Sequence, residues 1–345
     1  MIRAAVALLA LALVLGQPAA AQSFAQLAAD ASPSRHERLV AGAKQEGSLT
    51  LYTSNAAQTI KRLAADFEKR YGVKVEVWRA SSAKVLQRLV AEKQAGRWDF
   101  DAASASSPEL EALYREGLLQ EVNSRRHAEM LEGTVPAHRG WAPQFLNVFV
   151  QAYNTQAVKK DELPRRWADL LDAKWKGRLG VEAKAGEWYC ALAKTPGGGD
   201  AVDTLRRVGE RNGWSVRNGN SLLANMVVSG EVPLALAVYS HMIDEAKAQG
   251  APVDWFAIGP MIGRSNGIGV SRRPRHPDAA LLFYEYSLGE GQQILAQLKY
   301  VSPLASMPSP FRGEGLAFVD PGASPAEVER CDDDYEALIR SKPAK

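Results

Sequence analysis

The chain has 345 residues, of which 46% are hydrophobic, 42 are lysine or arginine and 39 are aspartate or glutamate. The formal net charge, 42 − 39 = +3, gives no strong field that would attract nucleic acid or an anionic membrane surface, so partners are expected to be recognised locally. This length allows two domains, each with a core of its own.

The N-terminal residues have the pattern of a secretory signal. Arg3 is followed by an apolar run over 4–15 and by three alanines that end at Ala21. The apolar run is too short to span a bilayer. We therefore predict a cleaved signal peptide over 1–21 and a mature soluble chain, starting at Gln22, in the periplasm.

Strand-like and helical patterns alternate in the first part of the mature chain. Apolar segments at 49–52, 75–78 and 100–103 alternate with helical patterns over 56–71, 85–96 and 108–116. This alternation predicts right-handed βαβ crossovers and a mostly parallel sheet flanked by helices.

Small hydroxyl and amide residues follow each of these three strands. They are Ser54, Asn55, Ser81, Ser82, Ser106 and Ser107. Consecutive βα units place such strand ends along one sheet edge, where hydroxyls and helix N-terminal N–H groups can converge on a ligand. The alternative is that they only cap helices, because serine and asparagine are preferred there. The nearest basic residue for an anion is Arg79.

A second α/β lobe is predicted downstream. An extended segment over 146–154 leads into a helix starting near Leu163, and later a chain return over 266–270 leads into helices over 277–295. Between them we expect a strand at 179–182, a glycine loop at 197–199, a helix at 220–230 and a buried strand at 232–239. A chain that leaves one lobe and returns makes crossing strands, the architecture of a hinge.

These patterns divide the chain into units. Lobe 1 is expected to comprise 46–146 and 266–305, lobe 2 to comprise 147–265, and 306–345 to form a loose tail with one short helix. The cysteines are Cys190 and Cys331. They could pair in an exported protein, but the sequence does not give the Cα separation that a disulfide requires.

Several catalytic motifs are missing from the sequence: it contains no HExxH, CxxC or GxxxxGK[ST]. The enzymatic alternative is Cys190 acting as a nucleophile in the cleft, flanked by Glu187 and Trp188. Such a cysteine needs a lowered pKa and a nearby base, neither of which the sequence identifies. We therefore expect a binding protein rather than an enzyme.

Several strings resemble one family over residues 46–305. They are GSLTLYTS, FEKRYGVKVEVWRASSAKVLQRLVAE, VFVQAYNT, LLDAKWKGRLG, SGEVPLALAVY and LLFYEYSLGEGQQILA. In order and spacing they resemble the periplasmic solute-binding proteins of ABC importers, of the ferric-iron-binding type. The resemblance implies a type II periplasmic binding protein fold, in which a monomer closes two lobes on a solute and delivers it to an inner-membrane permease.

The same resemblance implies a metal site that this sequence only partly retains. Ferric-binding members use a histidine, a glutamate and two adjacent tyrosines, and the matching positions here are near Asn55 or Ala56, near Ser106, and at Tyr239 and Ser240. Only Tyr239 matches. Fe³⁺ favours anionic oxygen ligands, so Glu182, Glu187 or His241 would have to rebuild the site, or an anion would have to complete it.

A small organic anion, or an iron–anion complex, is the competing solute. The serines would donate hydrogen bonds to its oxygens, and Tyr239 and Ser240 would contact it from lobe 2. Trp141, Trp188 and Trp255 either stack on the solute or pack in cores, as aromatic residues commonly do. No cofactor is expected, apart from Fe³⁺ as a transported ligand.

Overall fold

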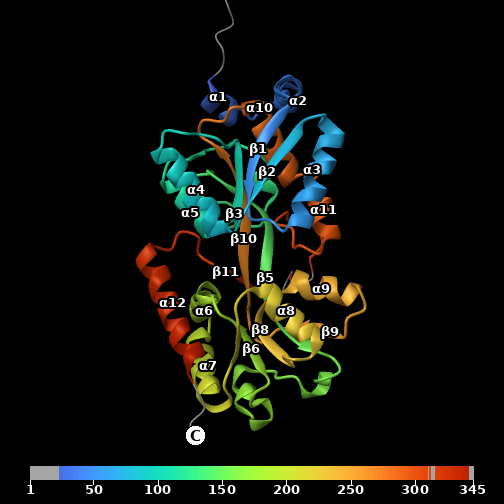
Figure 1. Cartoon of the computed structure of the whole chain (residues 1–345), viewed down its shortest axis with the longest axis vertical. Helices are drawn as coiled ribbons and strands as arrows, with labels where there is room; N and C mark the ends of the chain where they lie inside the picture. The colour runs from blue at the N-terminus through green and yellow to red at the C-terminus, as the bar shows by residue number, and fades with distance from the viewer. Residues whose placement is uncertain (1–22, 310, 312–314, 342–345) are drawn as a thin grey trace, which may run out of the picture.

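The computed structural model describes residues 23–309, 311 and 315–341. The predicted signal peptide, 1–21, lies outside these residues. Two α/β lobes lie one above the other and are joined by the long strands β5 (Ala142–Asn154) and β10 (Met261–Ser271) (Figure 1). The predicted α/β class and two-lobed architecture are confirmed. Within the described part of the chain, no helix has the length and apolar character needed to cross a membrane.

The first lobe follows the predicted βα alternation. Its parallel strands are β2 (Lys74–Arg79), β1 (Ser48–Thr53) and β3 (Ala102–Ser106), in that order. The connecting helices are α3 (Ala57–Tyr71), α4 (Ser82–Gln94) and α5 (Ser107–Arg115). Ile60, Leu63 and Phe67 lie on the buried face of α3, which is why this amphipathic segment packs as a helix on the sheet.

Other segments complete this lobe. The helices α1 (Phe24–Ala29), α2 (Arg35–Glu46), α10 (Pro277–Leu288) and α11 (Gln292–Gln297) pack around its core, and β4 (Leu119–Gln120) pairs with β10. A short 3₁₀ helix, η1, covers Arg125–Glu129. The lobe therefore begins before residue 46, its predicted start, because Leu39 and Ala43 of α2 are fully buried in the same core.

The second lobe has its own sheet and core. Its strands are β6 (Leu179–Glu182), β7 (Ser215–Arg217), β8 (Leu234–Tyr239) and β9 (Val253–Phe256), and its helices are α6 (Gly186–Ala193), α7 (Gly198–Asn212), α8 (Asn220–Ser229) and α9 (Ser240–Ala248). Every residue of β8 is buried, in agreement with the strand predicted from its continuous apolar run.

Two local predictions in this lobe are wrong. The helix expected from Leu163 is a set of short 3₁₀ helices, η2 (Lys160–Glu162), η3 (Trp167–Leu171) and η4 (Ala173–Trp175). The Asp169 carboxylate accepts hydrogen bonds from the backbone N–H groups of Arg165 and Arg166, and the Asp172 side chain caps the next turn. These local hydrogen bonds divide the segment into short turns in place of one long helix. The glycine loop expected at 197–199 is not a loop throughout, because α7 begins at Gly198.

The strands β5 and β10 hold the two lobes together. They pair with each other antiparallel, β10 also pairs with β3 in the first lobe, and β5 also pairs with β8 in the second. All 13 residues of β5 are buried. The predicted domain boundaries at 146/147 and 265/266 stay predictions, because each of these strands contributes to both lobes.

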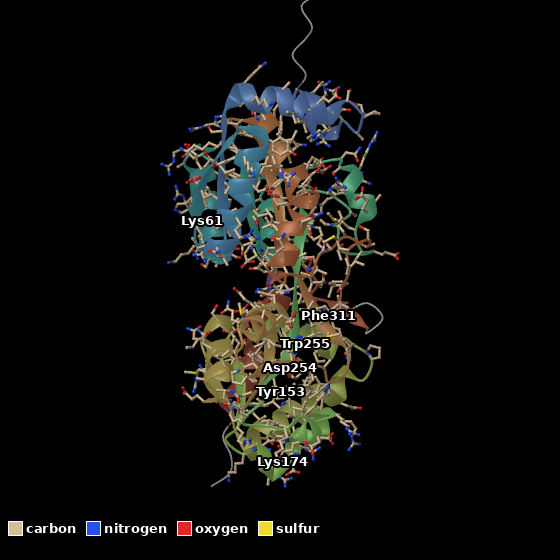
Figure 2. The ribbon with its side chains drawn as sticks, turned by 90° about the vertical axis from the view of Figure 1, so that its right-hand side faces the viewer. Lys61, Tyr153, Lys174, Asp254, Trp255 and Phe311 are labelled. Carbon is tan, nitrogen blue, oxygen red and sulfur yellow. A yellow bond between two sulfur atoms is a disulfide. The ribbon has the colours of Figure 1, made fainter. Side chains whose placement is uncertain are left out.

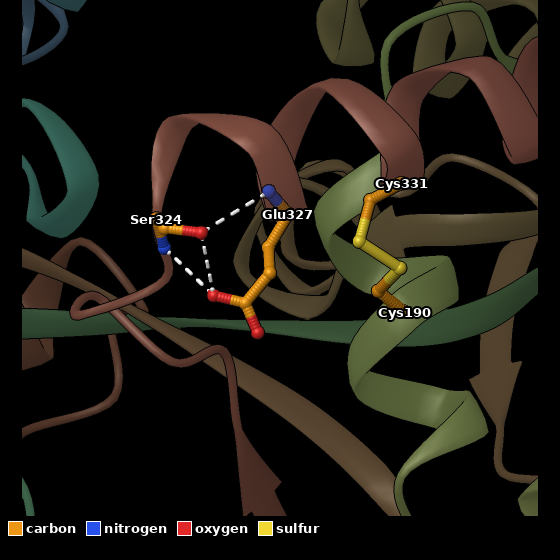
Figure 3. Close-up of a disulfide and its surroundings, with 4 residues drawn as sticks. All are labelled: Cys190, Ser324, Glu327 and Cys331. Atoms are coloured by element: carbon orange, nitrogen blue, oxygen red, sulfur yellow. Dashed lines mark hydrogen bonds between the residues drawn. A yellow bond between two sulfur atoms is a disulfide. The ribbon is translucent and has the colours of Figure 1, made fainter.

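The C-terminal segment differs from the predicted loose tail with a short helix. Strand β11 (Leu316–Phe318) pairs parallel with β10, and α12 (Pro325–Arg340), of 16 residues, packs on α6 and α7 (Figure 1). A capping box between Ser324 and Glu327 starts α12, and a disulfide joins Cys331 to Cys190 of α6 with a Cα separation of 5.7 Å (Figure 3). The pairing that the sequence left open is therefore formed.

Removing the disulfide is expected to destabilise the protein. The double variant Cys190→Ser/Cys331→Ser should lose about 2–4 kcal/mol in free energy of unfolding, because the unfolded chain is no longer restrained by a cross-link between distant residues. The midpoint of urea unfolding measures this loss. Reduced parent protein is the control and should match the variant. An unchanged midpoint would show that α12 needs no covalent attachment.

Candidate functional site

Three serine hydroxyls meet at the carboxyl ends of the first lobe's strands. The Ser82 Oγ lies 2.9 Å from the Ser54 Oγ and 3.0 Å from the Ser106 Oγ, and it accepts the Ser106 backbone N–H at 3.2 Å. Ser54 follows β1, Ser82 is the first residue of α4, and Ser106 ends β3. The predicted convergence of strand ends is thus realised for these three serines. The Ser82 hydroxyl uses its proton and both lone pairs in these contacts, whereas the Ser54 hydroxyl keeps a proton to donate.

Asn55 has a different environment from the serines beside it. Its side-chain amide donates to Gln144 Oε1 at 2.8 Å, and its carbonyl oxygen accepts from Asn266 Nδ2 at 2.6 Å and from the Ser104 hydroxyl at 3.3 Å. Asn55 is 2% exposed. It therefore fastens the first lobe to β5, through Gln144, and to β10, through Asn266. Its predicted role as a ligand contact stays untested.

The remaining predicted polar contacts of this lobe have separate environments. Ser81 is exposed and caps α4, accepting the Lys84 backbone N–H. Ser107 is buried in the first turn of α5, and its hydroxyl has no partner among the described residues. Arg79 donates from Nε to the Asn55 backbone oxygen at 2.7 Å. Ser107 is thus the one of the three whose hydrogen-bonding capacity is unused inside the protein.

An arginine organises the second-lobe side of the site. The Arg264 guanidinium, from β10, contacts the Glu187 carboxylate of α6 and the Tyr239 hydroxyl at the end of β8. The pairing of β8 with β5 contains a bulge in β8, where Leu236 and Ala237 lie opposite Gln151, and Ala237 has a left-handed backbone, with φ 56°. Such a bulge re-aims the strand just before Tyr239.

The protonation equilibria of this cluster reflect burial and mutual charge. Burial raises the pKa of Tyr239, although Arg264 opposes the shift. Burial also raises the pKa of Glu187, again against Arg264. For Arg264 itself burial works against the charged form, but Glu187 and Tyr239 outweigh it and raise the arginine pKa. The site therefore holds a permanent positive charge beside a neutral phenol.

A second carboxyl group faces the same cluster from the first lobe. Glu109, in the first turn of α5, has a pKa raised by burial and only partly lowered by Arg264. Its Oε2 has no hydrogen-bond partner among the described residues, and neither has Arg264 Nε. Glu109, Glu187 and Arg264 all line one cavity of about 1370 Å³ between the lobes. Both unpartnered atoms thus belong to residues that face a large cavity.

The three tryptophans considered from the sequence are packed against protein. Trp141 is 1% exposed and donates to Glu111, and Trp188 is 3% exposed in the second-lobe core. Trp255 donates to Asp244 and stacks on Phe311, which lies next to it below the junction of the lobes (Figure 2). Their rings are engaged by the protein itself, as the core-packing alternative predicts.

The other candidates from the second lobe are also buried. Glu182 accepts the backbone N–H groups of Lys184 and Gly219, which accounts for its carboxylate within the fold. Ser240 is 1% exposed as the first residue of α9. His241 is 6% exposed and packs on Tyr300, and burial lowers its pKa to about 4. Of these three side chains, His241 reaches the Arg264 cluster, because its ring stacks on Tyr239 with 5.8 Å between the ring centroids.

Sequence reasoning missed Arg264 and Glu109. Arg264 lies in a segment of small and apolar residues, MIGRSNGIGV, where a charge inside a crossing strand is unusual and could have been noticed. Glu109 resembles any acidic residue in a first helical turn, where the helix dipole favours it. Only the fold brings Glu109 close to the second lobe.

The polar groups at this site suit the binding of an anion. The Cys190 alternative is wrong, because its sulfur is in the disulfide with Cys331 and is no free thiolate. In the described part of the chain no group of three or more His, Cys, Asp or Glu side chains is placed to hold a metal ion. Hydroxyls, a guanidinium and a phenol are groups that donate hydrogen bonds to an anion.

Comparisons with known proteins indicate a solute-binding protein. The family model described as bacterial extracellular solute-binding protein matches residues 62–311. The chain is similar to Iron uptake protein A1 of Synechocystis sp., with 26% identity over 77% of this chain and 78% of that protein.

The solved structures include iron-bound HitA from Pseudomonas aeruginosa, at 23% identity, TM-score 0.69 and coverage of 84% and 98% of the two chains. They also include AfuA from Actinobacillus pleuropneumoniae with fructose-6-phosphate bound, at 21% identity, TM-score 0.64 and coverage of 85% and 97%. These similarities confirm the fold predicted from the sequence.

The buried histidine predicts an acid-dependent loss of stability. With a pKa of about 4 when folded and about 6.5 when unfolded, His241 binds a proton preferentially in the unfolded chain between these pH values. Stability should therefore fall as pH decreases from 6.5 to 4, by up to about 3 kcal/mol from this residue. Urea unfolding of His241→Gln should show a correspondingly weaker pH dependence.

His36 supplies the matched control, because it is exposed on α2. His36→Gln should leave the pH dependence of the parent protein unchanged. Equal pH dependence in the parent and in His241→Gln would contradict the assignment of a neutral buried His241.

Proposed function

The chain belongs to the bacterial extracellular solute-binding protein family, and we propose from this premise that its solute is a small molecule carrying a carboxylate or phosphate group. It serves as the solute-binding component of an ABC importer. The proposal concerns the cargo and the residues that hold it: Ser54, Ser82, Ser106 and Ser107 from the first lobe, and Tyr239 with Arg264 from the other side.

The observation that carries this proposal is the position of Arg264. It is a permanent cation on a strand that pairs with both lobes, and its Nε has no hydrogen-bond partner among the residues that the structure describes. Asn266 lies two residues after Arg264 on β10 and pairs with Ser106 of β3. The serine cluster and the guanidinium are therefore both next to β10. A guanidinium and hydroxyl donors are the groups that recognise planar or tetrahedral oxyanions.

Ferric iron accompanied by an anion is the second candidate. Tyr239 supports it, as do the iron-binding descriptions of Iron uptake protein A1 and HitA. Iron held by protein groups alone is less favoured here, because burial disfavours the phenolate form of Tyr239 that would bind Fe³⁺. Arg264 also donates a hydrogen bond to the Tyr239 hydroxyl. An anion that pairs with Arg264 would complete the coordination of the metal.

We propose that binding closes the lobes. A solute that contacts the serines of one lobe and Tyr239 of the other favours the closed arrangement over an open one by its differential contacts. The closed, loaded monomer would then deliver the solute to a permease in the inner membrane. This places the mature chain in the periplasm after removal of residues 1–21.

Charge removal at Arg264 and truncation of Tyr239 test the proposal. Arg264→Gln and Tyr239→Ala should each weaken anion binding more than tenfold, since each removes a buried contact to the solute. Calorimetric titrations with citrate, Fe³⁺–citrate and fructose-6-phosphate measure the affinities. The parent should bind at least one of these probes.

Arg166→Gln is the control, because Arg166 is exposed in the second lobe and pairs with Asp169 there. Its affinities should equal those of the parent. Parent-like binding by Arg264→Gln would remove the arginine from the site and with it the argument for an anionic cargo.

A further inference from the structure

The cavity between the lobes is larger than a simple ion requires. Its volume is about 1370 Å³, whereas pockets for small organic ligands commonly have about 300–1,000 Å³. One wall comes from α4 and α5 of the first lobe, and the other from α6, β11 and α12. The C-terminal segment, predicted as a loose tail with one short helix, therefore lines the cavity together with Arg264 and Glu187.

Two of the residues that face the cavity are polar and incompletely hydrogen-bonded within the described chain. Arg264 and Glu109 line it, and Arg264 Nε and Glu109 Oε2 are buried without hydrogen-bond partners in the described chain. Burial raises the pKa of Glu109, which lowers the cost of placing an anionic group beside it. The anionic head of a ligand would accept a hydrogen bond from Arg264 Nε, and a hydroxyl on that head would donate one to Glu109 Oε2.

Apolar side chains contribute to both walls of the cavity, among charged ones such as Lys194 and Asp333. Leu86 and Val90 of α4 face the cavity from the first lobe, and Phe318 of β11 and Val328 of α12 face it from the other side. Val328 is 43% exposed, one of few large apolar side chains with such exposure among the described residues. Water-exposed apolar side chains around a cavity mark a surface that an apolar ligand would cover.

The C-terminal wall is held in place from both lobes. Arg115 of α5 donates to the Gly322 backbone oxygen at 2.8 Å, and the disulfide fixes Cys331 to α6. The segment between these two attachments, which includes Val328, thus spans from the first lobe to the second. A wall fixed at both ends gives this side of the cavity a defined shape.

We propose that this cavity receives the body of the solute, which is an organic acid or phosphate ester with an apolar chain or ring, its anionic head at Arg264 and Glu109. The inference rests on the proposed anionic cargo, and it specifies further that this cargo is larger than a simple ion and partly apolar. The C-terminal segment then determines specificity: it would favour amphipathic anions over compact ones such as inorganic phosphate.

A homologous series of anions tests the inference. Butanoate, hexanoate and octanoate, together with inorganic phosphate and octyl phosphate, are titrated into the full mature protein by calorimetry. Each buried methylene strengthens binding by up to about fourfold, so octanoate should bind at least tenfold more tightly than butanoate. Octyl phosphate should exceed inorganic phosphate similarly. Val328→Asp should abolish this dependence on chain length.

Val77→Asp is the matched control, because Val77 is similarly exposed, at 42%, but lies on β2 away from the cavity. It should retain the chain-length dependence. Affinities that do not rise with chain length, long members that fail to bind, or equal effects of the two aspartate variants would overturn the inference. A wrong proposal of an anionic cargo gives a different result, because Arg264→Gln would then leave the binding of every probe unchanged.

Discussion

The antiparallel ladder between β5 and β10 is the constraint on which the rest of the molecule depends. Each strand pairs with a lobe-specific strand as well, β10 with β3 and β5 with β8, so the backbone hydrogen bonds of both sheets continue through the junction. Burial of every β5 residue leaves little freedom within this ladder. Strand ends from both lobes are consequently brought to a common cleft.

Residues along β10 have two different roles, because one stabilises the fold and another faces the cavity. Asn266 is used by the fold, because its amide donates to Asn55 in a buried network that also includes Gln144. Arg264, two positions away, faces the cavity, and its Nε has no hydrogen-bond partner in the described part of the chain. Glu187 and Tyr239 contact its guanidinium. A bound anion would share or replace the contact with Glu187, which links solute capture to the second lobe.

Sequence patterns predicted the parts of the fold that local periodicity determines. The three βα units, the fully apolar β8 and the return of the chain through β10 are confirmed, because strand and helix periods were clear there. The C-terminal segment was interpreted as loose because its prolines, glycines and aspartates hid the capping box at Ser324 and the contact surface for α6. Long-range packing, which no local pattern contains, decided that part.

The site was predictable only in part for a related reason. Serines at strand ends converge whenever the strands are parallel, so Ser54, Ser82 and Ser106 followed from topology. Whether Asn55 faces a ligand or a neighbouring strand depends on Gln144 and Asn266, which lie far away in the sequence. The position of Glu109 relative to Arg264 depends likewise on how the lobes sit together.

Native mass spectrometry of the mature protein, purified gently from the periplasm of the cells that produce it and compared with the same sample after denaturation, tests the central claim most directly. The account predicts a released mass that corresponds to an organic anion, alone or accompanied by iron. A mass excess of iron alone, with no anion, would contradict it and would make Tyr239 the centre of a protein-only ferric site.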